Sequence, residues 1–278
     1  HAPVEDVTEI VVISTAGDRV QDRALFEIGG KGPFTQEIEE PLSDARIHVA
    51  VHSMKDMPTL LPAGLVIDCF LERADPRDAF LSPKASSLAT LPEGATVGTS
   101  SLRRAAQVKA RRPDVTVVPF RGNVDTRLRK LEEGIADATF LAMAGLIRMD
   151  MAGRVTAPLS PDEMLPAVAQ GAIGVERREA DDEAAHPLAK LNHTETALRV
   201  AAERAFLAVL DGSCRTPIAA LAEIAGERMR LRTMILTPDG AEVHETEREG
   251  LAADAVALGI DAGEDLKGRA GPHFFDEV

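Results

Sequence analysis

The chain has 278 residues, of which 45% are hydrophobic and 27% charged, and its formal net charge is −14. This is the composition of a globular protein long enough for two or three domains, which excludes a disordered or fibrous chain. The negative charge argues against nucleic acid as a partner. No apolar run approaches the length of a membrane span.

The two cysteines cannot form a disulfide framework, so we expect a cytoplasmic protein in a reducing compartment. No signal peptide is visible. Because the first residue is His1, we expect that the natural N-terminus lies upstream of it.

The first part of the chain alternates predicted strands and helices, which favours an α/β fold. Residues 9–14 are expected to form a strand, 15–32 a polar loop with glycines at its end, and 34–42 a helix. Two apolar runs, residues 47–51 and 64–71, predict buried strands. Cys69 lies inside the second run, so we expect it to be a small core residue rather than a reactive thiol.

The stretch HSMKDMP follows the strand predicted at residues 47–51. Pro58 ends regular structure because it lacks an N–H donor, so Ser53, Lys55 and Asp56 come where a strand ends and a loop begins. Ligands of open α/β sheets bind at such strand ends. The alternative is a surface turn with a solvated Lys-Asp pair. If the alternation of the strand continues, Lys55 points away from Asp56.

A second α/β set follows a break at residues 75–78. The pattern predicts strands at 96–98, 116–120 and 138–144 and helices ending near 111 and spanning 125–133. A Pro-rich stretch at 158–166 is a second crossover candidate, and residues 170–176 are again strand-like.

A long amphipathic helix is expected over residues 192–210, with Asn192 as its N-cap and Glu195 as the capping-box partner. It leads into a Gly-Ser turn that contains Cys214. Beyond the turn, residues 229–236, 240–247 and 251–266 predict strand, strand and helix, a small α+β domain.

Positive charge is concentrated in one part of this acidic chain. Between Thr99 and Lys130 there are nine Lys and Arg residues and only two acids. Several arginines come at or just after predicted strand ends, namely Arg103, Arg104, Arg121, Arg127 and Arg148. The planar guanidinium binds both oxygens of a carboxylate, so we predict a ligand with several carboxylates. The alternative, a solvated helix face, applies to Lys109, Arg111, Arg112, Arg129 and Lys130. Thr99 and Ser101 precede a helix and offer hydroxyls and N–H groups to an anion.

Cys214 lies in a predicted loop beside Arg215, a cation that favours the thiolate. No histidine is placed as a base for a cysteine hydrolase, and the seven histidines form no metal-ligand cluster. No CxxC, Walker A loop or GxGxxG after a strand occurs. The cysteine is therefore expected to anchor a group, and no metal is expected.

Seven motifs together resemble the porphobilinogen deaminase family, also called hydroxymethylbilane synthase: HSMKDMP, GTSSLRR, RGNVDTRL, LAMAGLIR, LPAVAQGAIGVE, NHTETALRVAAERAFL and GSCRTPIAA. The resemblance implies two α/β lobes like those of periplasmic binding proteins and a small C-terminal α+β domain. We expect a first lobe from residues 1–73 and 170–190, with its N-terminal strand missing from this sequence. The second lobe, with an arginine-rich cleft, is expected at 77–166 and the third domain at 193–278.

The resemblance also implies a transferase of tetrapyrrole biosynthesis that acts as a monomer. It joins four porphobilinogen molecules head to tail on a dipyrromethane cofactor and releases hydroxymethylbilane by hydrolysis. It implies that Cys214 carries the cofactor through a thioether and that Asp56 is the catalytic carboxylate. Arg103, Arg104, Arg121 and Arg127 are implied to pair with cofactor carboxylates, and Arg148 with substrate. Further matching positions are Ser53, Lys55, Thr99 and Ser101 for the cofactor and Lys31 for the substrate.

The sequence departs from the family pattern at Ala16, where arginine is common, and at Ser213 and Asp125, where glycine is frequent. We expect Asp125 to point away from the arginines or to pair with Arg127. The competing interpretation is a two-lobed, non-catalytic binding protein for a small polyanion, since fold alone does not set function. Asp56 and Cys214 favour the enzyme, because a simple anion receptor needs neither.

Overall fold

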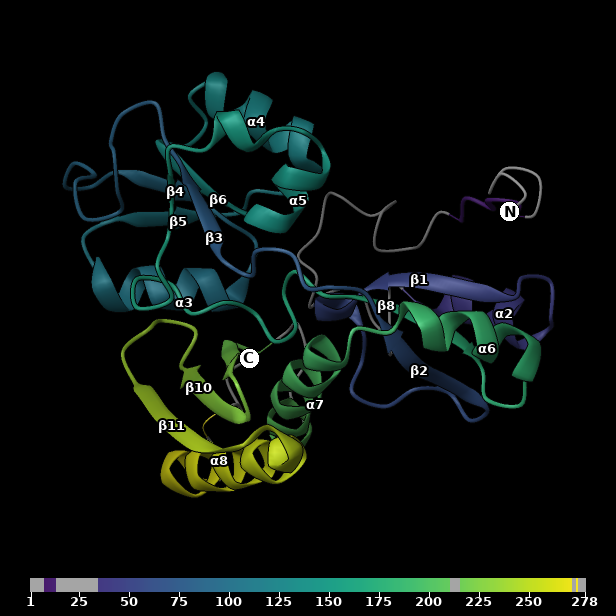
Figure 1. The fold of residues 1–278 in the computed structure, drawn as a ribbon. Helices are drawn as coiled ribbons and strands as arrows, with labels where there is room; N and C mark the ends of the chain where they lie inside the picture. Colours follow the sequence, from purple (N-terminus) through teal and green to yellow (C-terminus); the bar gives the residue numbers. More distant parts are fainter. Residues whose placement is uncertain (1–7, 14–34, 211–215, 272–273, 275–278) are drawn as a thin grey trace.

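The computed structural model describes residues 8–13, 35–210, 216–271 and 274. Its helices and strands form three bodies (Figure 1). Each body is built around its own sheet, and the three sheets have the strand orders β1-β8-β2, β5-β4-β6-β3-β7 and β11-β10-β9. The predicted mixed α/β class with a C-terminal α+β part is confirmed.

The first body consists of an antiparallel sheet with a helix on each face. Its strands are β1 (Val49–Ser53), β2 (Leu65–Phe70) and β8 (Ile173–Arg178), and its helices are α2 (Gln36–Ser43) and α6 (Asp182–Leu191). Leu42 of α2 packs on Ala50 and Leu65, whereas Leu188 of α6 packs on Cys69 and Val175. Successive strand residues face opposite sides, so the two helices cover the two faces. Cys69 is buried, as predicted.

The second body has a mixed sheet of β3 (Asp78–Leu81), β4 (Thr96–Gly98), β5 (Thr116–Val118), β6 (Ala138–Ala142) and β7 (Ala157–Pro158). β4 runs parallel to β5 and β6, and β3 runs antiparallel to β6. Phe140 belongs to one buried cluster and its neighbour Leu141 to another. Both faces of this sheet are therefore covered, which explains its continuous apolar strands. The covering helices are α3 (Leu102–Arg111), α4 (Val124–Glu132) and α5 (Met143–Arg148).

The third body packs α7 (Thr194–Val209) and α8 (Ala255–Ala270) on one face of β9 (Ile218–Ala225), β10 (Arg228–Leu236) and β11 (Val243–Leu251). The helices approach closely at Gly259, where a Cβ would lie 2.2 Å from the Ala202 carbonyl oxygen. The other face contacts the second body, because Leu221 and Met234 cluster with Ala106 of α3 and with Leu165. The third body is thus in contact with the arginine-bearing helix.

Several sequence predictions need correction. Residues 8–13 form no strand, and Ile10 and Val12 are 88% and 90% exposed, because no described strand pairs with them. The strands β3 and β9 and the helices α5 and α6 were not predicted. β3 was missed because its first residue, Asp78, belongs to the polar stretch Asp-Pro-Arg-Asp. α5 was missed because its first residues continue the apolar run of β6, so residues 138–144 were predicted as one strand.

The N-cap of α7 was also wrongly predicted. It is His193, whose ring Nδ1 accepts a hydrogen bond from the Thr196 amide at 3.2 Å. The Asn192 side chain instead accepts one from the Phe70 amide of β2 at 3.0 Å. That side chain links the end of α6 to β2, so a contact within the first body replaces the predicted cap.

Candidate active site

Asp56 lies at the end of a short 3-10 helix, Met54–Asp56, directly after β1. Met54 and Met57 on either side of the Lys-Asp pair are only 2% and 4% exposed, whereas Asp56 is exposed. The helical turn replaces the strand alternation expected there. The loop therefore buries two methionines as anchors and presents the carboxylate between them.

Lys55 is half-buried, and several charged groups act on its ammonium group. Burial lowers the pKa of its ammonium group, Asp56 and Asp78 raise it, and Arg104 and Arg103 lower it. Lys55 therefore interacts electrostatically with Asp56 of its own turn and with the charges around Asp78. Of the Lys-Asp pair, Asp56 is exposed and Lys55 is half-buried.

Arg103 and Arg104 are buried in the first turn of α3, and both bind the carboxylate of Asp78 at the start of β3. Arg103 Nη1 donates to Asp78 Oδ2 at 2.8 Å, and Arg104 Nη2 donates to Asp78 Oδ1 at 2.6 Å. Arg103 Nη1 also donates to the Leu165 carbonyl at 2.7 Å, and Arg104 Nη1 donates to the Phe140 carbonyl at 3.0 Å. Two guanidinium groups thus share one carboxylate, and this buried group keeps a net positive charge.

The charges around Asp78 explain its ionisation. The two arginines outweigh the effect of burial and hold the pKa of the Asp78 carboxyl well below its usual range. Arg103 Nε is buried without a hydrogen-bond partner. Asp78 therefore stays ionised and leaves donor capacity unused on Arg103.

Arg127 adds a further cation near this group. Its Nε donates to the Gly122 carbonyl at 2.7 Å, in a turn where Gly122 has φ +121° and a Cβ would meet Thr126 at 2.5 Å. Burial, then Arg104 and Arg121, lower the pKa of Arg127 to about 10. None of the described carboxylates forms an ion pair with it, and Asp125 is exposed instead of paired. The turn thus holds Arg127 among like charges.

The hydroxyl residues before α3 serve local structure. The Ser101 side chain caps the helix by accepting a hydrogen bond from the Arg104 amide, and the Thr99 hydroxyl accepts one from the Ser101 amide. Arg148 is the last residue of α5, not a strand-end residue, and donates to the Gly171 carbonyl at 2.8 Å. Ser53 ends β1 and is half-buried. Ligand roles for these four residues stay predictions.

Lys31 and Cys214 lie outside the described residues, as do the departures Ala16 and Ser213. The other cysteine, Cys69, is 1% exposed in β2, and burial, with a smaller effect of Asp68, raises the pKa of its thiol. A buried, protonated thiol is a poor nucleophile. No described residues form a group of three or more metal-binding side chains, and no described helix is long and apolar enough to span a membrane.

Sequence reasoning missed two residues that contact the predicted site residues or their loop, Asp78 and Arg204. Asp78 was assigned to a crossover, although an aspartate that opens the apolar run Ala79-Phe80-Leu81 is a signal for a buried ion. Arg204 of α7 donates to the backbone beside Asp56. The available signal at Arg204 was a positive charge on a helix whose one face was predicted to lie in the core.

The fold and these side chains define a two-lobed α/β protein with a third domain and a buried cluster of net positive charge. Two family models match the chain: "Porphobilinogen deaminase, dipyromethane cofactor binding domain" over residues 2–186 and "Porphobilinogen deaminase, C-terminal domain" over residues 197–268. The chain belongs to the porphobilinogen deaminase family, as predicted. The predicted cofactor agrees with the description of the first model.

Curated relatives support the same family over nearly the whole chain. The porphobilinogen deaminase of Paracoccus denitrificans is 61% identical over 99% of this chain and 88% of its own length. The chloroplastic porphobilinogen deaminase of Oryza sativa is 54% identical over 99% of this chain and 77% of its own. Among solved structures, and separate from these relatives, a periplasmic substrate-binding protein from Coxiella burnetii aligns with 62% of this chain and 81% of its own at 16% identity, with a TM-score of 0.38.

Proposed function

We propose that the protein is a transferase that polymerises porphobilinogen, as the family implies. In each cycle the aminomethyl carbon of one porphobilinogen loses ammonia and joins the free α-carbon of the preceding pyrrole, which loses a proton. Four such additions precede hydrolysis, in which water completes the released hydroxymethylbilane. Two observations carry the proposal: the exposed Asp56 carboxylate follows a buried anchor, and two buried arginines share one carboxylate, with Lys55 interacting electrostatically with both groups.

The arginines bind the substrate side chains in this proposal. Each porphobilinogen brings two carboxylates, so a growing chain needs a region of excess positive charge. Arg103, Arg104 and Arg127, with Arg121 and Arg148, supply it, and Lys31 is a further substrate contact predicted from sequence. The open donor of Arg103 and the unpaired guanidinium of Arg127, among the described residues, support this assignment.

Asp56 is the catalytic residue of the proposal. Loss of ammonia leaves positive charge on the substrate, and a fixed carboxylate nearby stabilises that charge. Met54 and Met57 hold the loop so that Asp56 needs little rearrangement during the reaction. Lys55 and Ser53 line the same turn and are proposed as cofactor contacts together with Thr99 and Ser101.

Dipyrromethane, when bound, supplies the pyrrole α-carbon that starts the chain. The described residues fit such a group, because its carboxylates match the uncompensated cations around Asp78. Cys214 is proposed to hold it through a thioether. Cys69 does not suit this role, since its thiol is enclosed between β2, β8 and α6.

The test combines product assay and intact mass of the purified holoprotein. We expect hydroxymethylbilane to form from porphobilinogen and the protein to carry two extra pyrrole units. Cys69→Ser should keep this added mass, and Cys214→Ser should lose it. A Cys214→Ser protein that still carries the mass contradicts the attachment site. Porphobilinogen binding without product would favour the polyanion-binding protein.

We further propose the boundaries 1–73 with 170–190, 77–166 and 193–278 for three domains, and a monomer that acts in the cytoplasm without nucleic acid. The three sheets with separate strand sets support the domains. The net charge of −14 supports the lack of nucleic-acid binding. Light scattering during size-exclusion chromatography tests the monomer.

A further inference from the structure

The loop that follows Asp56 is held by a side chain from the third body. The Arg204 guanidinium of α7 donates to the backbone carbonyls of Met57, Pro58 and Thr59, at 3.3, 2.6 and 3.4 Å. These three carbonyls directly follow the carboxylate-bearing residue. One side chain thus fixes the path of the loop over three consecutive residues.

Arg204 is committed to this contact. Burial lowers the pKa of its guanidinium group, and within the described chain no carboxylate forms an ion pair with it. All described hydrogen bonds of this half-buried guanidinium go to backbone carbonyls. Hydrogen bonds from charged donors are strong and directional, so these bonds favour one arrangement of the carbonyls. The loop is therefore held in one register against α7.

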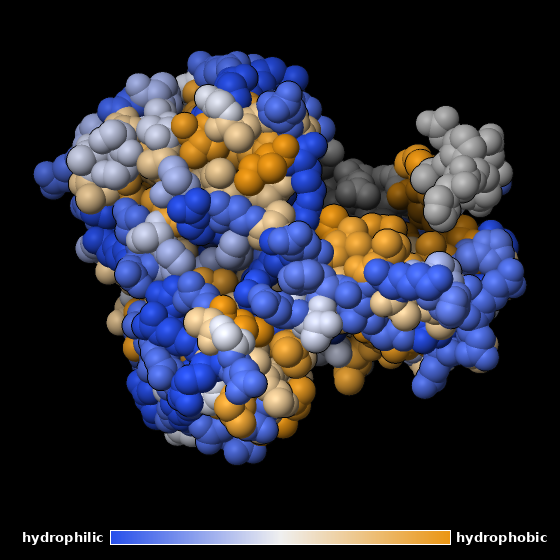
Figure 2. Space-filling model, in the orientation of Figure 1, coloured by the Kyte–Doolittle hydropathy of each residue, from blue (hydrophilic) through white to orange (hydrophobic). Residues whose placement is uncertain are grey.

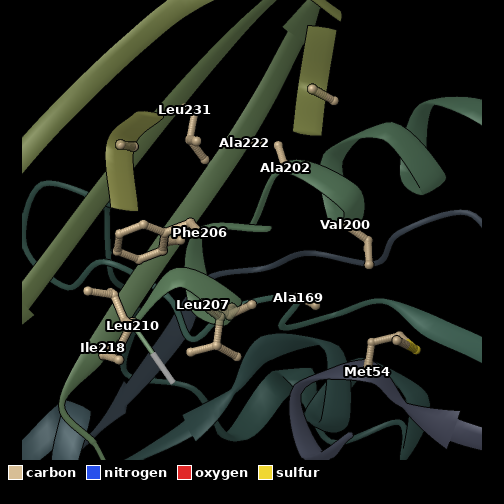
Figure 3. Close-up of a cluster of buried hydrophobic side chains, with 14 of the residues drawn as sticks. Met54, Ala169, Val200, Ala202, Phe206, Leu207, Leu210, Ile218, Ala222 and Leu231 are labelled. Carbon is tan, nitrogen blue, oxygen red and sulfur yellow. The ribbon is translucent and has the colours of Figure 1, made fainter. Parts of the chain in front are cut away.

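A hydrophobic contact supports the polar one. Met54 and Met57 belong to the same buried cluster as Val200 and Phe206 of α7. Figure 3 shows Met54 near Val200 in this core. Met54 also lies against Gly174 of β8, where a Cβ would come within 2.3 Å of its sulfur atom. The turn with Asp56 is thus packed between β8 and α7.

We propose that Arg204 is a positioning residue that sets the location of the Asp56 carboxylate. The proposal rests on the catalytic role proposed for Asp56. Arg204 belongs to the third body, so that body determines where the carboxylate of the first body lies. An arginine suits this task better than a lysine, since its planar fork spreads donors over several carbonyls.

The first test replaces Arg204 and compares matched variants of the holoprotein. In Arg204→Met we expect kcat to fall about 10²-fold, because a displacement near 1 Å can have such an effect. KM should change much less, and Arg204→Lys should restore part of kcat. The control is Arg199→Met on the same helix, whose side chain pairs with Glu195 at 2.7 Å and should leave kcat unchanged.

The second test asks whether Arg204 acts through Asp56. In a double-mutant cycle, adding Arg204→Met to Asp56→Asn should lower kcat little further, since coupled residues are not additive. Hydrogen exchange of the peptide that spans residues 54–61 should accelerate in Arg204→Met and not in Arg199→Met. Hydrogen exchange can be measured even if Arg204→Met is poorly active. If Arg204→Met does not fold, the same measurement is made on Arg204→Lys.

The outcomes separate the two claims. If Asp56→Asn keeps normal turnover, the proposed function fails. If Asp56→Asn loses turnover while Arg204→Met keeps kcat, only the positioning role is wrong. Independent, multiplicative losses in the double variant also overturn it, because they would assign Arg204 to general stability.

Discussion

Two buried carboxylates in this protein, Glu203 and Asp78, are surrounded by different numbers of cations. Glu203 of α7 meets one guanidinium, that of Arg73, and also accepts hydrogen bonds from the amides of Ala169 and Ala222 at 2.6 and 2.8 Å. Asp78 meets two guanidinium groups. All five charged side chains are at most 7% exposed. The first cluster is neutral, whereas the second keeps a positive charge.

This difference in charge distinguishes a structural ion pair, at Glu203, from the proposed binding site, at Asp78. Glu203 binds Arg73 after β2, Ala169 before β8 and Ala222 of β9, so its cluster connects the third body to the segments that enter and leave the second, and it needs no ligand. The Asp78 cluster has a cation in excess and an unused donor on Arg103. Gln170 contacts both clusters, because its backbone carbonyl accepts a hydrogen bond from Arg73 and its side-chain amide donates one to Asp78. The excess positive charge around Asp78 is consistent with the proposed anionic ligand, whereas the neutral cluster around Glu203 is consistent with a structural role.

The largest expected effect is on stability at the neutral cluster. Glu203→Ala leaves Arg73 buried without its counterion, and we expect the free energy of unfolding to fall by about 3–5 kcal/mol. Urea denaturation measures it. Glu195→Ala, which removes the more exposed pair with Arg199, should lower it by less than about 1 kcal/mol. Equal losses in both variants would contradict the structural role of Glu203.

The next effect concerns turnover and should leave stability intact. Asp56→Asn keeps the shape of the side chain and removes its charge. We expect the activation free energy to rise by about 2.7–4 kcal/mol, or about two to three decades in kcat. Asp56→Glu should keep part of kcat because the charge remains. Steady-state formation of hydroxymethylbilane measures both, with circular dichroism as the check of folding. Normal kcat in folded Asp56→Asn contradicts its electrostatic role.

A smaller effect is expected when one cation is removed from the site. Arg127→Leu should lose a charge-assisted bond to a ligand carboxylate, about 1.5–3 kcal/mol, and lower kcat/KM about ten- to a hundredfold. Arg129→Leu on the same helix is the control, since Arg129 is exposed and lies near Glu133. Equal kinetics in the two variants would remove Arg127 from the site.

The smallest expected effect is a dependence of the free energy of unfolding on pH, which arises from the ion pairs of Asp78. The pKa of Asp78 is held below its unfolded value, so it contributes stability above about pH 3.9 that is lost as pH falls toward the folded pKa. Urea denaturation at about pH 7 and about pH 3 should therefore show a larger loss in the wild type than in Asp78→Asn. The same acid sensitivity in both proteins would contradict the ion pairs.

The sequence allowed the family, the α/β class and most elements with regular apolar periodicity to be predicted, including α3 and β10. Short segments such as β3 and α5 were missed because they have too few residues for a period. The clustered arginines were visible, but the Asp78 carboxylate that orients two of them lies 25 and 26 positions away in the chain. Contacts between distant segments, such as Arg204 with Pro58, leave no local pattern.

The most direct test of the central claim, that this cationic site holds a growing polycarboxylate, is the intact mass of holoprotein mixed with limiting porphobilinogen. The account predicts a ladder of covalent species, each heavier by one porphobilinogen less one ammonia, with hydroxymethylbilane appearing as the ladder is used up. Arg127→Leu should change which species accumulate, and Arg129→Leu should not. A protein whose mass stays constant while porphobilinogen binds reversibly would contradict the account.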